Sequence, residues 1–422
     1  MPQFSKQEFV AFEQLTAGFD DALVLSSNVN IYKVDDVTAE RSNNIIWRPM
    51  PYIMPSFDGS DATQNFKDVT QLSVPASINV KKHSPWTLTA EQLRDAMQED
   101  RLMAAATQKL ASDINVATLN VAGNFGSLFV KRASAASGFD DVALCDAIMN
   151  EQGVPMTDRA LALSSRDYNG IARDLSSAGR SFGNRKTDNA YENAYVGNVA
   201  GFETFKLDYA FNKAAAAGGA GLTIDTRASA LNYYVPRATT VALTGESSNV
   251  DNRFQTITIS STTNVAAGDA FTIANCLAVN HITKQSTGQL KTFRVVSVPS
   301  STTLVITPAI VSNQGGTDAE RQYQNVVFSS TASNASITFL NTASGFLNPF
   351  WHKDAIEVIP GRLGLQPYGI DILKTTTKHG FEVVMTKQTD INTHLTKYRI
   401  DVLFGVVNKN PQMTGVIMFS QP

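Results

Sequence analysis

The chain has 422 residues, of which 43% are hydrophobic and only 17% charged, with a formal net charge of -3. This length predicts two or three lobes with cores of their own. The charge excludes a protein that coats nucleic acid through a basic surface, because phosphate binding needs clustered Lys and Arg. The same charge is compatible with a near-neutral wall that encloses DNA. The shortage of charge favours a surface suited to extensive protein contact, although a Thr/Ser-rich β domain would lower it equally well.

The cysteines and the N-terminus indicate where the chain works. Cys145 and Cys276 fall in different predicted lobes, which argues against a disulfide framework and for a reducing cytoplasm. Glu8 and Glu13 interrupt the N-terminal segment, so no signal peptide is predicted. No run of about 18 apolar residues indicates a membrane span.

The N-terminal segment predicts a helix from about residue 5 to residue 25. It opens with the capping box Ser5-Lys6-Gln7-Glu8. An apolar stripe recurs at helical spacing: Phe9, Phe12, Leu15, Phe19 and Leu23. The stripe could dock on its own chain, which is the commoner arrangement, or on a neighbouring copy or an assembly helper.

Residues 45–80 predict a two-stranded ribbon around the polar tip Phe57-Asp58-Gly59-Ser60-Asp61. The returning arm alternates with period two, which indicates a strand with one covered face, at Leu72, Val74, Ala76, Ile78 and Val80. Because a two-stranded ribbon is marginal in water, its apolar face must be covered by the same chain or by the next copy.

A second capping box, Thr89-Ala90-Glu91-Gln92, opens the strongest helical pattern, in which no Pro or Gly occurs before Gly123. Its apolar residues step by three and four: Met103, Ala106, Leu110, Ile114, Ala117 and Val121. A helix of about thirty residues spans about 45 Å. We expect it to lie as a beam across a sheet.

Residues 140–209 alternate helix and strand and predict an α/β lobe. One helix carries Val142, Cys145, Ile148 and Met149 on one face, the strand 159–163 follows, and the next helix is capped at Ser164. Cys145 is therefore predicted to be a core residue rather than a nucleophile.

The composition changes at the small, flexible linker 213–221. Short β-branched runs then predict an inserted closed β-barrel or sandwich, at 254–259, 271–274, 292–298, 304–307, 326–328 and 337–340. Strands of the main body resume at 355–359, 381–387, 397–404 and 414–419. In the segment 397–404, Tyr398, Ile400, Val402 and Phe404 are expected on one face, with Arg399 and Asp401 on the other.

No pattern of catalytic or metal-binding residues emerges. The run Gly179-Arg180-Ser181-Phe182-Gly183 matches G-x-S-x-G, but a helical pattern approaches it and a polar loop leaves it, so Ser181 is not predicted to be a nucleophile. The five histidines are scattered and lack zinc-ligand spacing: His83, His281, His352, His379 and His394. We predict no catalytic residue, no cofactor and no metal.

A polar excursion at 244–253 in the predicted insert places Glu246, Asp251 and Arg253 close together in sequence. It could be an ordinary exposed hairpin. It could equally be a charged finger that pairs with the same finger of a neighbouring copy about a two-fold axis.

In this order the elements resemble those of the major capsid proteins of tailed double-stranded-DNA phages, which share the Hong Kong 97 capsid fold. More narrowly, the chain is similar to coat proteins of lambdoid podoviruses of the P-22 type, which carry an inserted β-barrel. The matching stretches are Asn44-Ile45-Ile46-Trp47-Arg48-Pro49, Leu88-Thr89-Ala90-Glu91-Gln92-Leu93-Arg94-Asp95, Gly126-Ser127-Leu128 and Val250-Asp251-Asn252-Arg253-Phe254.

The resemblance implies an α+β fold of the Hong Kong 97 type with defined parts. These are an N-terminal arm (1–40), an E-loop (41–88), the spine helix and P domain (89–139), an A domain (140–220 and 346–372), the inserted β-barrel (221–345) and closing P-domain strands (373–422).

The resemblance also implies a structural protein rather than an enzyme. It implies hexamers and pentamers in an icosahedral shell, a scaffolding protein, a portal at one vertex, and a procapsid that forms in the host cytoplasm and expands. The mature shell encloses double-stranded DNA without sequence-specific binding and involves no membrane. Two alternatives are a cellular nanocompartment shell of the same fold and an adhesin that binds glycans through the insert.

Contacts with other chains are expected at three places. The finger contributes Glu246, Asp251 and Arg253, and the E-loop tip contributes Asp58 and Asp61. The N-terminal arm contributes Phe9, Phe12, Glu13 and Phe19, toward the scaffold or a neighbour. The ribbon and the N-terminal stripe are expected to be completed by sister copies.

Overall fold

The computed structural model of the chain describes residues 6–422 except 24, 26–27, 35–42, 52–53, 55, 57, 64, 67, 95, 177–189, 191, 219–220, 225–232, 330–333 and 366–368. It divides into two compact units. Unit 1 comprises Met1–Ile46, Pro75–Asn120 and Ile356–Val407, and unit 2 comprises Trp47–Val74, Val121–Ala355 and Asn408–Pro422.

Unit 1 is built on a six-stranded sheet in the order β1-β21-β24-β23-β22, with β4 also pairing with β24. Its strands are β1 (Asn30–Ile31), β4 (Val80–Thr89), β21 (Ile356–Pro360), β22 (Asp371–Thr376), β23 (Glu382–Thr389) and β24 (Leu395–Asn408). The predicted alternation in β24 is confirmed, since Tyr398, Ile400, Val402 and Phe404 are all buried. Asp401 is buried as well and pairs with Arg399 at 2.6 Å.

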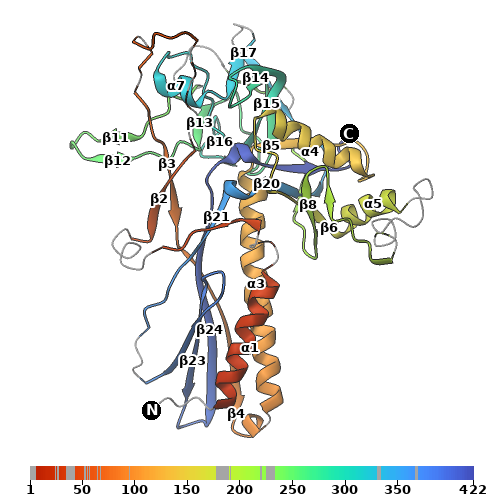
Figure 1. The fold of residues 1–422 in the computed structure, drawn as a ribbon, viewed down its shortest axis with the longest axis vertical. Helices are drawn as coiled ribbons and strands as arrows, with labels where there is room; N and C mark the ends of the chain where they lie inside the picture. Colours follow the sequence, from red (N-terminus) through yellow and green to blue (C-terminus); the bar gives the residue numbers. More distant parts are fainter. Residues whose placement is uncertain are drawn as a thin grey trace. The chain divides into compact units, whose positions relative to one another are not determined.

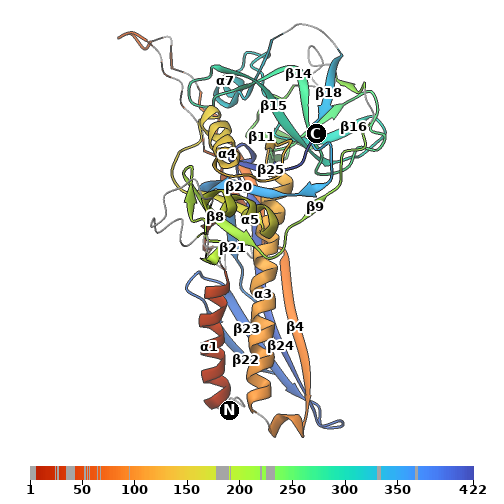
Figure 2. The same ribbon diagram turned by 90° about the vertical axis from the view of Figure 1, so that its right-hand side faces the viewer.

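Two helices of unit 1 lie along one side of this sheet, α1 (Lys6–Ala22) and the first part of α3 (Ala96–Phe125) (Figures 1 and 2). The predicted thirty-residue beam is confirmed, although α3 runs past Gly123 to Phe125. Thr89 and Gln92 form the predicted reciprocal cap, at 3.1 and 3.3 Å. It closes the short 3₁₀ turn η2 (Gln92–Arg94), however, and α3 begins after that turn.

The stripe of α1 docks on its own chain, the commoner of the two arrangements that the sequence left open, so the expectation that sister copies complete it is wrong for the residues that are buried here. Phe12, Leu15, Phe19 and Leu23 are buried, and the Phe19 ring meets the Phe381 ring edge-on at 6.4 Å between centroids. The predicted capping residue Ser5 lies outside the described residues. Four of the five stripe positions thus contribute to the core of unit 1.

A buried ion pair also fastens α1. The Glu8 carboxylate, 6% exposed, lies 2.7 Å from the Lys387 ammonium on β23 and accepts a hydrogen bond from the Tyr398 hydroxyl at 3.5 Å. A charge this buried is tolerated only while its partners stay in place. Glu8 therefore ties the helix to two neighbouring strands.

We expect Glu8→Gln to lower the free energy of unfolding by about 1–3 kcal/mol, because a neutral amide replaces the charged partner of a mostly buried lysine. Urea unfolding of the full chain measures the change. Glu13→Gln is the matched control, since Glu13 is exposed on the same helix, and a surface change should stay within about 0.5 kcal/mol. Equal effects of both variants would contradict the prediction.

In the predicted ribbon, β2 (Ile45–Pro49) and β3 (Ser73–Ser77) pair with each other. The predicted alternation is confirmed, since Leu72, Val74, Ala76 and Ile78 are buried within the chain. Within unit 2, the insert's helix α7 (Asp318–Tyr323) holds the start of the returning arm. The Tyr323 hydroxyl donates to the Thr70 carbonyl at 3.0 Å and accepts from the Leu72 amide at 3.4 Å. For these residues the expectation that sister copies supply the cover is wrong, because the chain supplies it.

The α/β lobe of unit 2 carries a six-stranded sheet in the order β5-β25-β20-β6-β8-β7. Its strands and helices are β5 (Leu128–Lys131), α4 (Phe139–Glu151), β6 (Arg159–Ser164), α5 (Ser165–Leu175), β7 (Asn198–Val199), β8 (Phe202–Leu207), β20 (Asn348–His352) and β25 (Thr414–Met418). The Ser164 hydroxyl accepts from the Asp167 amide, which confirms the predicted cap. Cys145 is fully buried, as predicted, and burial raises the pKa of its thiol.

The insert leaves and re-enters the lobe through a neck, where β9 (Asn212–Lys213) pairs with β19 (Gly345–Phe346). Its seven-stranded sheet runs β10-β18-β14-β15-β16-β13, with β17 pairing β14. The strands are β10 (Thr223–Ile224), β13 (Gln255–Thr258), β14 (Ala270–Val279), β15 (Ser286–Ser297), β16 (Thr303–Thr307), β17 (Val326–Phe328) and β18 (Ala335–Phe339). A bridge between Ile224 in β10 and Ile259, the residue after β13, links the two ends of this strand order, as a closed barrel requires.

Candidate functional site

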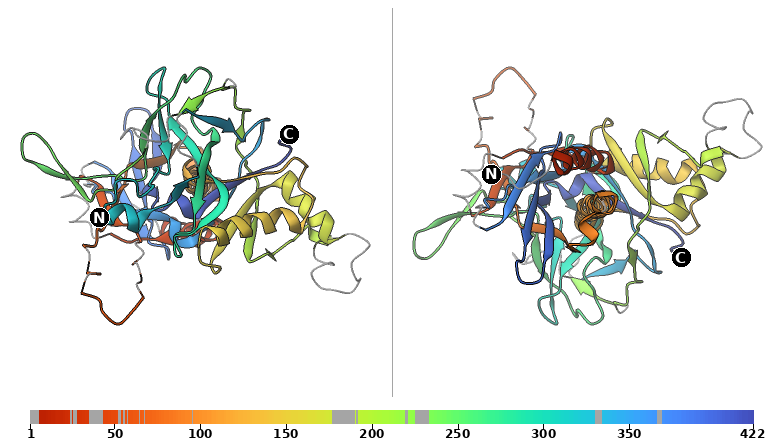
Figure 3. Two further views of the ribbon diagram at one scale, coloured as in Figure 1. Left: turned by 90° about the horizontal axis from the view of Figure 1, so that it is seen from above. Right: turned by 90° about the horizontal axis from the view of Figure 1, so that it is seen from below.

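The polar excursion of the insert is an antiparallel hairpin, β11 (Thr239–Val241) and β12 (Ser247–Asn249), with Thr239 opposite Asn249. It projects away from the barrel of unit 2 (Figures 1 and 3). Every residue from 239 to 249 is exposed. Its apolar residues Val241 (67% exposed) and Leu243 (fully exposed) have no cover from the described chain.

The base of this hairpin is held by Asn252, which is 8% exposed. Its Oδ1 accepts from the Tyr234 hydroxyl and the Arg237 amide, both at 3.0 Å. Its Nδ2 donates to the Arg237 carbonyl at 2.9 Å and the Val250 carbonyl at 3.0 Å. One side chain thus bonds the backbone on both sides of the hairpin, and the exposed arm stands on a fixed root.

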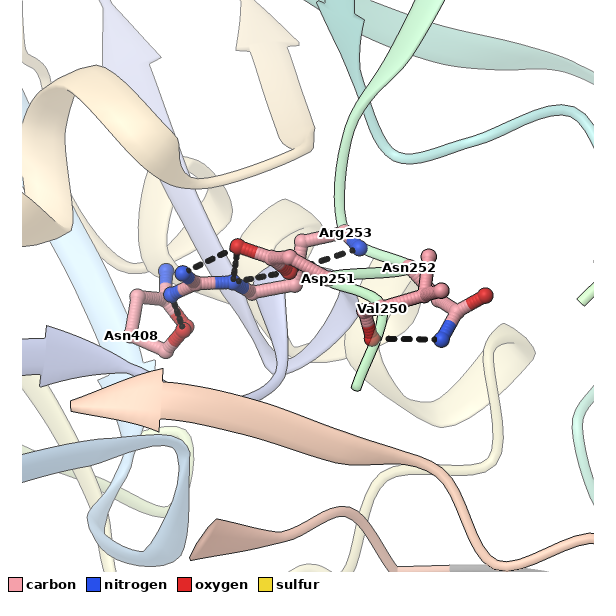
Figure 4. A network of polar contacts seen from close by, with 5 residues as sticks. All are labelled: Val250, Asp251, Asn252, Arg253 and Asn408. Atoms are coloured by element: carbon pink, nitrogen blue, oxygen red, sulfur yellow. Dashed lines mark hydrogen bonds and ion pairs between the residues drawn. The ribbon is translucent and has the colours of Figure 1, made fainter. Parts of the chain in front are cut away.

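Asp251 and Arg253 form an ion pair at the same root (Figure 4). The Arg253 guanidinium donates to the Asp251 carboxylate at 2.7 and 2.9 Å and to the Asn408 carbonyl at 2.8 Å (Figure 4). It also lies 5.0 Å above the Phe254 ring centroid. The structure therefore brings together two of the three predicted finger residues, within one chain. Glu246 lies apart on the exposed arm.

The loop between β2 and β3, predicted as the E-loop, carries the two predicted carboxylates, Asp58 and Asp61, both exposed. Asp61 accepts hydrogen bonds from the amide and the hydroxyl of Thr63, at 2.9 and 2.6 Å, which lower its pKa. Phe66 in the same loop is 85% exposed. Sequence analysis did not single out Phe66, because it belongs to no periodic pattern.

The N-terminal candidates are divided by the fold. Phe12 and Phe19 are buried in unit 1, whereas Phe9 (39% exposed) and Glu13 lie at the surface. A groove of about 520 Å³ runs between α1 and α3, lined by Ala11, Gln14, Leu15, Gly18, Ala22, Met103, Ala104, Thr107 and Gln108. Small residues of α1 and α3 face each other across this groove. The sequence pattern of either helix alone therefore does not predict it.

The described residues contain neither a candidate metal site nor a candidate membrane-spanning helix. Within the described ranges, no group of three or more His, Cys, Asp and Glu could hold a metal ion. No helix in the described part of the chain is long and apolar enough to cross a membrane. Ser181 and its surrounding motif lie outside the described residues.

The order of these elements, from N-terminal helix to ribbon, long helix, α/β lobe, inserted β domain and closing strands, is that of a Hong Kong 97-like capsid fold. The class is therefore the bacteriophage major capsid protein. Residues 2–420 match the family model described as P22 coat protein, gene protein 5. The chain belongs to the P22 coat protein family, whose members are structural capsid proteins.

Solved structures with phage or coat-protein titles are among those similar to this chain. One titled "Mycobacterium phage Che8" is 10% identical, covers 93% of this chain and 90% of that one, and has a TM-score of 0.44. "Capsid structure of the Cyanophage P-SCSP1u" is 12% identical, with 93% and 86% covered and a TM-score of 0.42. "CUS-3 coat protein I-domain" is 37% identical, with 30% of this chain and 99% of that one covered and a TM-score of 0.22.

Proposed function

We propose that the chain assembles on a scaffolding protein, in the host cytoplasm, into a procapsid of hexamers and pentamers that expands as double-stranded DNA enters through a portal. The family match over residues 2–420 carries this proposal. The net charge of -3 supports a wall that encloses DNA without holding it. Two free, buried cysteines are consistent with assembly in a reducing compartment.

The hairpin is the contact between capsomers in this proposal. It presents Glu246 together with the exposed Val241 and Leu243, an apolar surface that a second copy can bury. Asp251 and Arg253 serve the contact by bracing its root, since each satisfies the other's charge. Asp58 and Asp61 meet a neighbour at the E-loop tip. Many modest contacts of this kind sum through multivalency.

The exposed part of the N-terminal helix is the scaffold or neighbour contact. Phe9 and Glu13 lie at the surface, and the groove between α1 and α3 offers space beside them. Phe12 and Phe19 act indirectly, by holding the helix in place. Of the alternative functions, glycan binding by the insert loses support because Phe271 and Phe293 are fully buried and stack at 5.7 Å.

Electron microscopy of the chain expressed with the neighbouring phage genes tests the function. We expect hollow spheres of uniform size, and soluble monomers under all conditions would overturn the proposal. In the same assay, Glu246→Lys should raise the threshold concentration for assembly several-fold, because it reverses the charge that the exposed arm brings to the contact, and a surface that accepts the carboxylate repels the lysine. Glu203→Lys, an exposed change on the lobe, is the matched control and should leave the threshold unchanged.

A further inference from the structure

The side-chain amine of Lys291 on β15 is buried at the junction of the insert and the α/β lobe. Its side chain is 1% exposed. Its amine nitrogen donates to Gln152 Oε1 at 2.7 Å and to Gln412 Oε1 at 2.6 Å. Gln152 is the C-terminal cap of α4, and Gln412 belongs to the 3₁₀ turn η4 (Pro411–Met413) before β25. One lysine of the insert thus holds two separate segments of the lobe.

Other bonds confirm that this region is a docking surface within unit 2. The His281 amide donates to the Gln152 carbonyl at 3.2 Å, and Asn280 Nδ2 donates to the Glu151 carbonyl at 2.9 Å. The Thr292 hydroxyl donates to the Ser127 carbonyl at 2.6 Å. These neighbours are backbone groups, which keep their hydrogen-bonding character at any pH. Lys291 is the group in this set whose charge can change near neutrality.

The charge of Lys291 has no carboxylate partner among the described ion pairs. Its acceptors are neutral amides, and burial lowers its pKa to about 7, against a small opposing effect of the Cys276 thiol on β14. Burial also lowers the pKa of His281 well below its ordinary range, helped by Lys291 and Lys284 and opposed by a hydrogen bond to Gln412. His281 is therefore neutral at pH 7. Among the described residues, the two hydrogen-bond acceptors of Lys291 supply no negative charge.

We propose that Lys291 is a proton-operated latch: the insert stays docked on the lobe while this amine is neutral, and the junction opens when the amine takes up a proton and water. Opening returns Lys291 to solvent, where its ordinary pKa is 10.5. Between about pH 7 and pH 10.5 each opening event therefore takes up one proton, so the opening constant falls up to about tenfold per pH unit as pH rises. Docking is weakest at and below pH 7 and strengthens in alkali.

Hydrogen exchange of the full chain tests the latch. Peptides covering 150–154 and 410–413, measured from pH 7 to 9 and corrected for intrinsic exchange, should show an opening constant that falls severalfold per pH unit. Lys291→Met, permanently neutral, should remove this slope and raise protection at pH 7. Lys291→Arg, permanently charged, should remove the slope and leave protection low throughout. An unchanged slope in either variant would overturn the proposal.

Lys284 provides the matched control. Burial lowers its pKa to about 8, but its ammonium donates to the carbonyls of Gln322 and Gln324, both inside the insert. Lys284→Met should therefore keep the pH slope of the lobe peptides. If neither Lys291 variant folds, a ¹³C titration of the lysine ε-carbons in the native full chain decides. A lysine signal with its midpoint near pH 7 that is retained in Lys284→Met supports the latch, and the absence of such a signal overturns it.

Discussion

Replacing Gly405 by alanine is expected to destabilise unit 1 by about 3 kcal/mol or more, the upper end of what overpacking costs. A Cβ atom at this position would lie 2.1 Å from the Ser77 carbonyl oxygen and 3.2 Å from the Ile78 Cα. These are backbone atoms, so no side-chain rotation relieves the clash. The register of β24 with β4 ends one residue earlier, at Phe404 opposite Val80. Relief of the clash therefore requires the backbone at Gly405 or at Ser77 to move.

Urea unfolding of the full chain measures this effect, with Gly18→Ala as control. Gly18 lies exposed in the middle of α1, and an added Cβ would meet nothing within 4 Å. Alanine there should stabilise the helix by about 0.5–1 kcal/mol. The same chemical change thus has opposite signs at the two sites. A loss of less than about 1 kcal/mol for Gly405→Ala would show that the backbone yields more easily than expected.

The elements that could be predicted are those whose pattern is local. The stripe of α3 and the strands of the insert were visible because their apolar residues follow a helical or a strand period. Strand β4 was not predicted as a strand in its own right: it contains Lys81, Lys82, His83 and Pro85 and is largely exposed. It exists because each of its ten residues has a partner on β24, from Thr89 opposite Leu395 to Val80 opposite Phe404. Such pairing across the chain leaves no period in the sequence.

Helix α7 was also missed, although its signal was present. Thr317 and Glu320 form a reciprocal capping box, a pattern that can be read from sequence. The helix has only six residues, which is too short for an apolar period to emerge. Its importance lies in Tyr323, whose partners Thr70 and Leu72 are about 250 positions away, with separations of 253 and 251 residues.

The candidate contact could be located from sequence, but its internal arrangement could not. The polar run at 244–253 left an ordinary exposed hairpin and a charged finger open, and the hairpin of the structure spans residues 239–249. The separation of Glu246 from Asp251 and Arg253 follows from the register of β11 with β12 and from the fold around Asn252. Lys291 gave no signal at all, because its burial depends on Gln152, 139 positions away.

Arg294→Met is expected to stabilise the chain by about 1–4 kcal/mol, the gain found when buried charges give way to well-packed apolar side chains. Arg294 is fully buried, and none of its three guanidinium nitrogens has a hydrogen-bond partner among the described residues. Asp269 is the carboxylate whose charge favours the protonated guanidinium. It already pairs with Lys213 at 3.0 Å and accepts a hydrogen bond from Asn341 at 3.1 Å. The guanidinium lies 5.9 Å from the Phe129 ring centroid, in surroundings that methionine suits better.

Arg253→Met provides the control with the opposite sign. That guanidinium is also largely buried, but Asp251 and Asn408 use its donors. Its removal leaves a carboxylate without its partner and should cost about 2–4 kcal/mol. Urea unfolding of both variants at pH 7 gives the comparison. If Arg294→Met also destabilises the chain, ordered water or a shifted carboxylate satisfies that guanidinium in solution.

The pH dependence separates Arg294 from Lys291. Burial lowers the pKa of Arg294 to about 10, from 12.5, so the unfolded chain binds more protons only between these values. The destabilisation by Arg294 is fully present below pH 10 and fades above it. The gain from Arg294→Met should therefore be equal at pH 7 and pH 9. The gain in stability from Lys291→Met should shrink over the same interval. Because the pKa of Lys291 is about 7 in the folded chain and 10.5 in the unfolded chain, the folded wild type loses this proton as the pH rises while the unfolded chain keeps it, and the wild type becomes more stable.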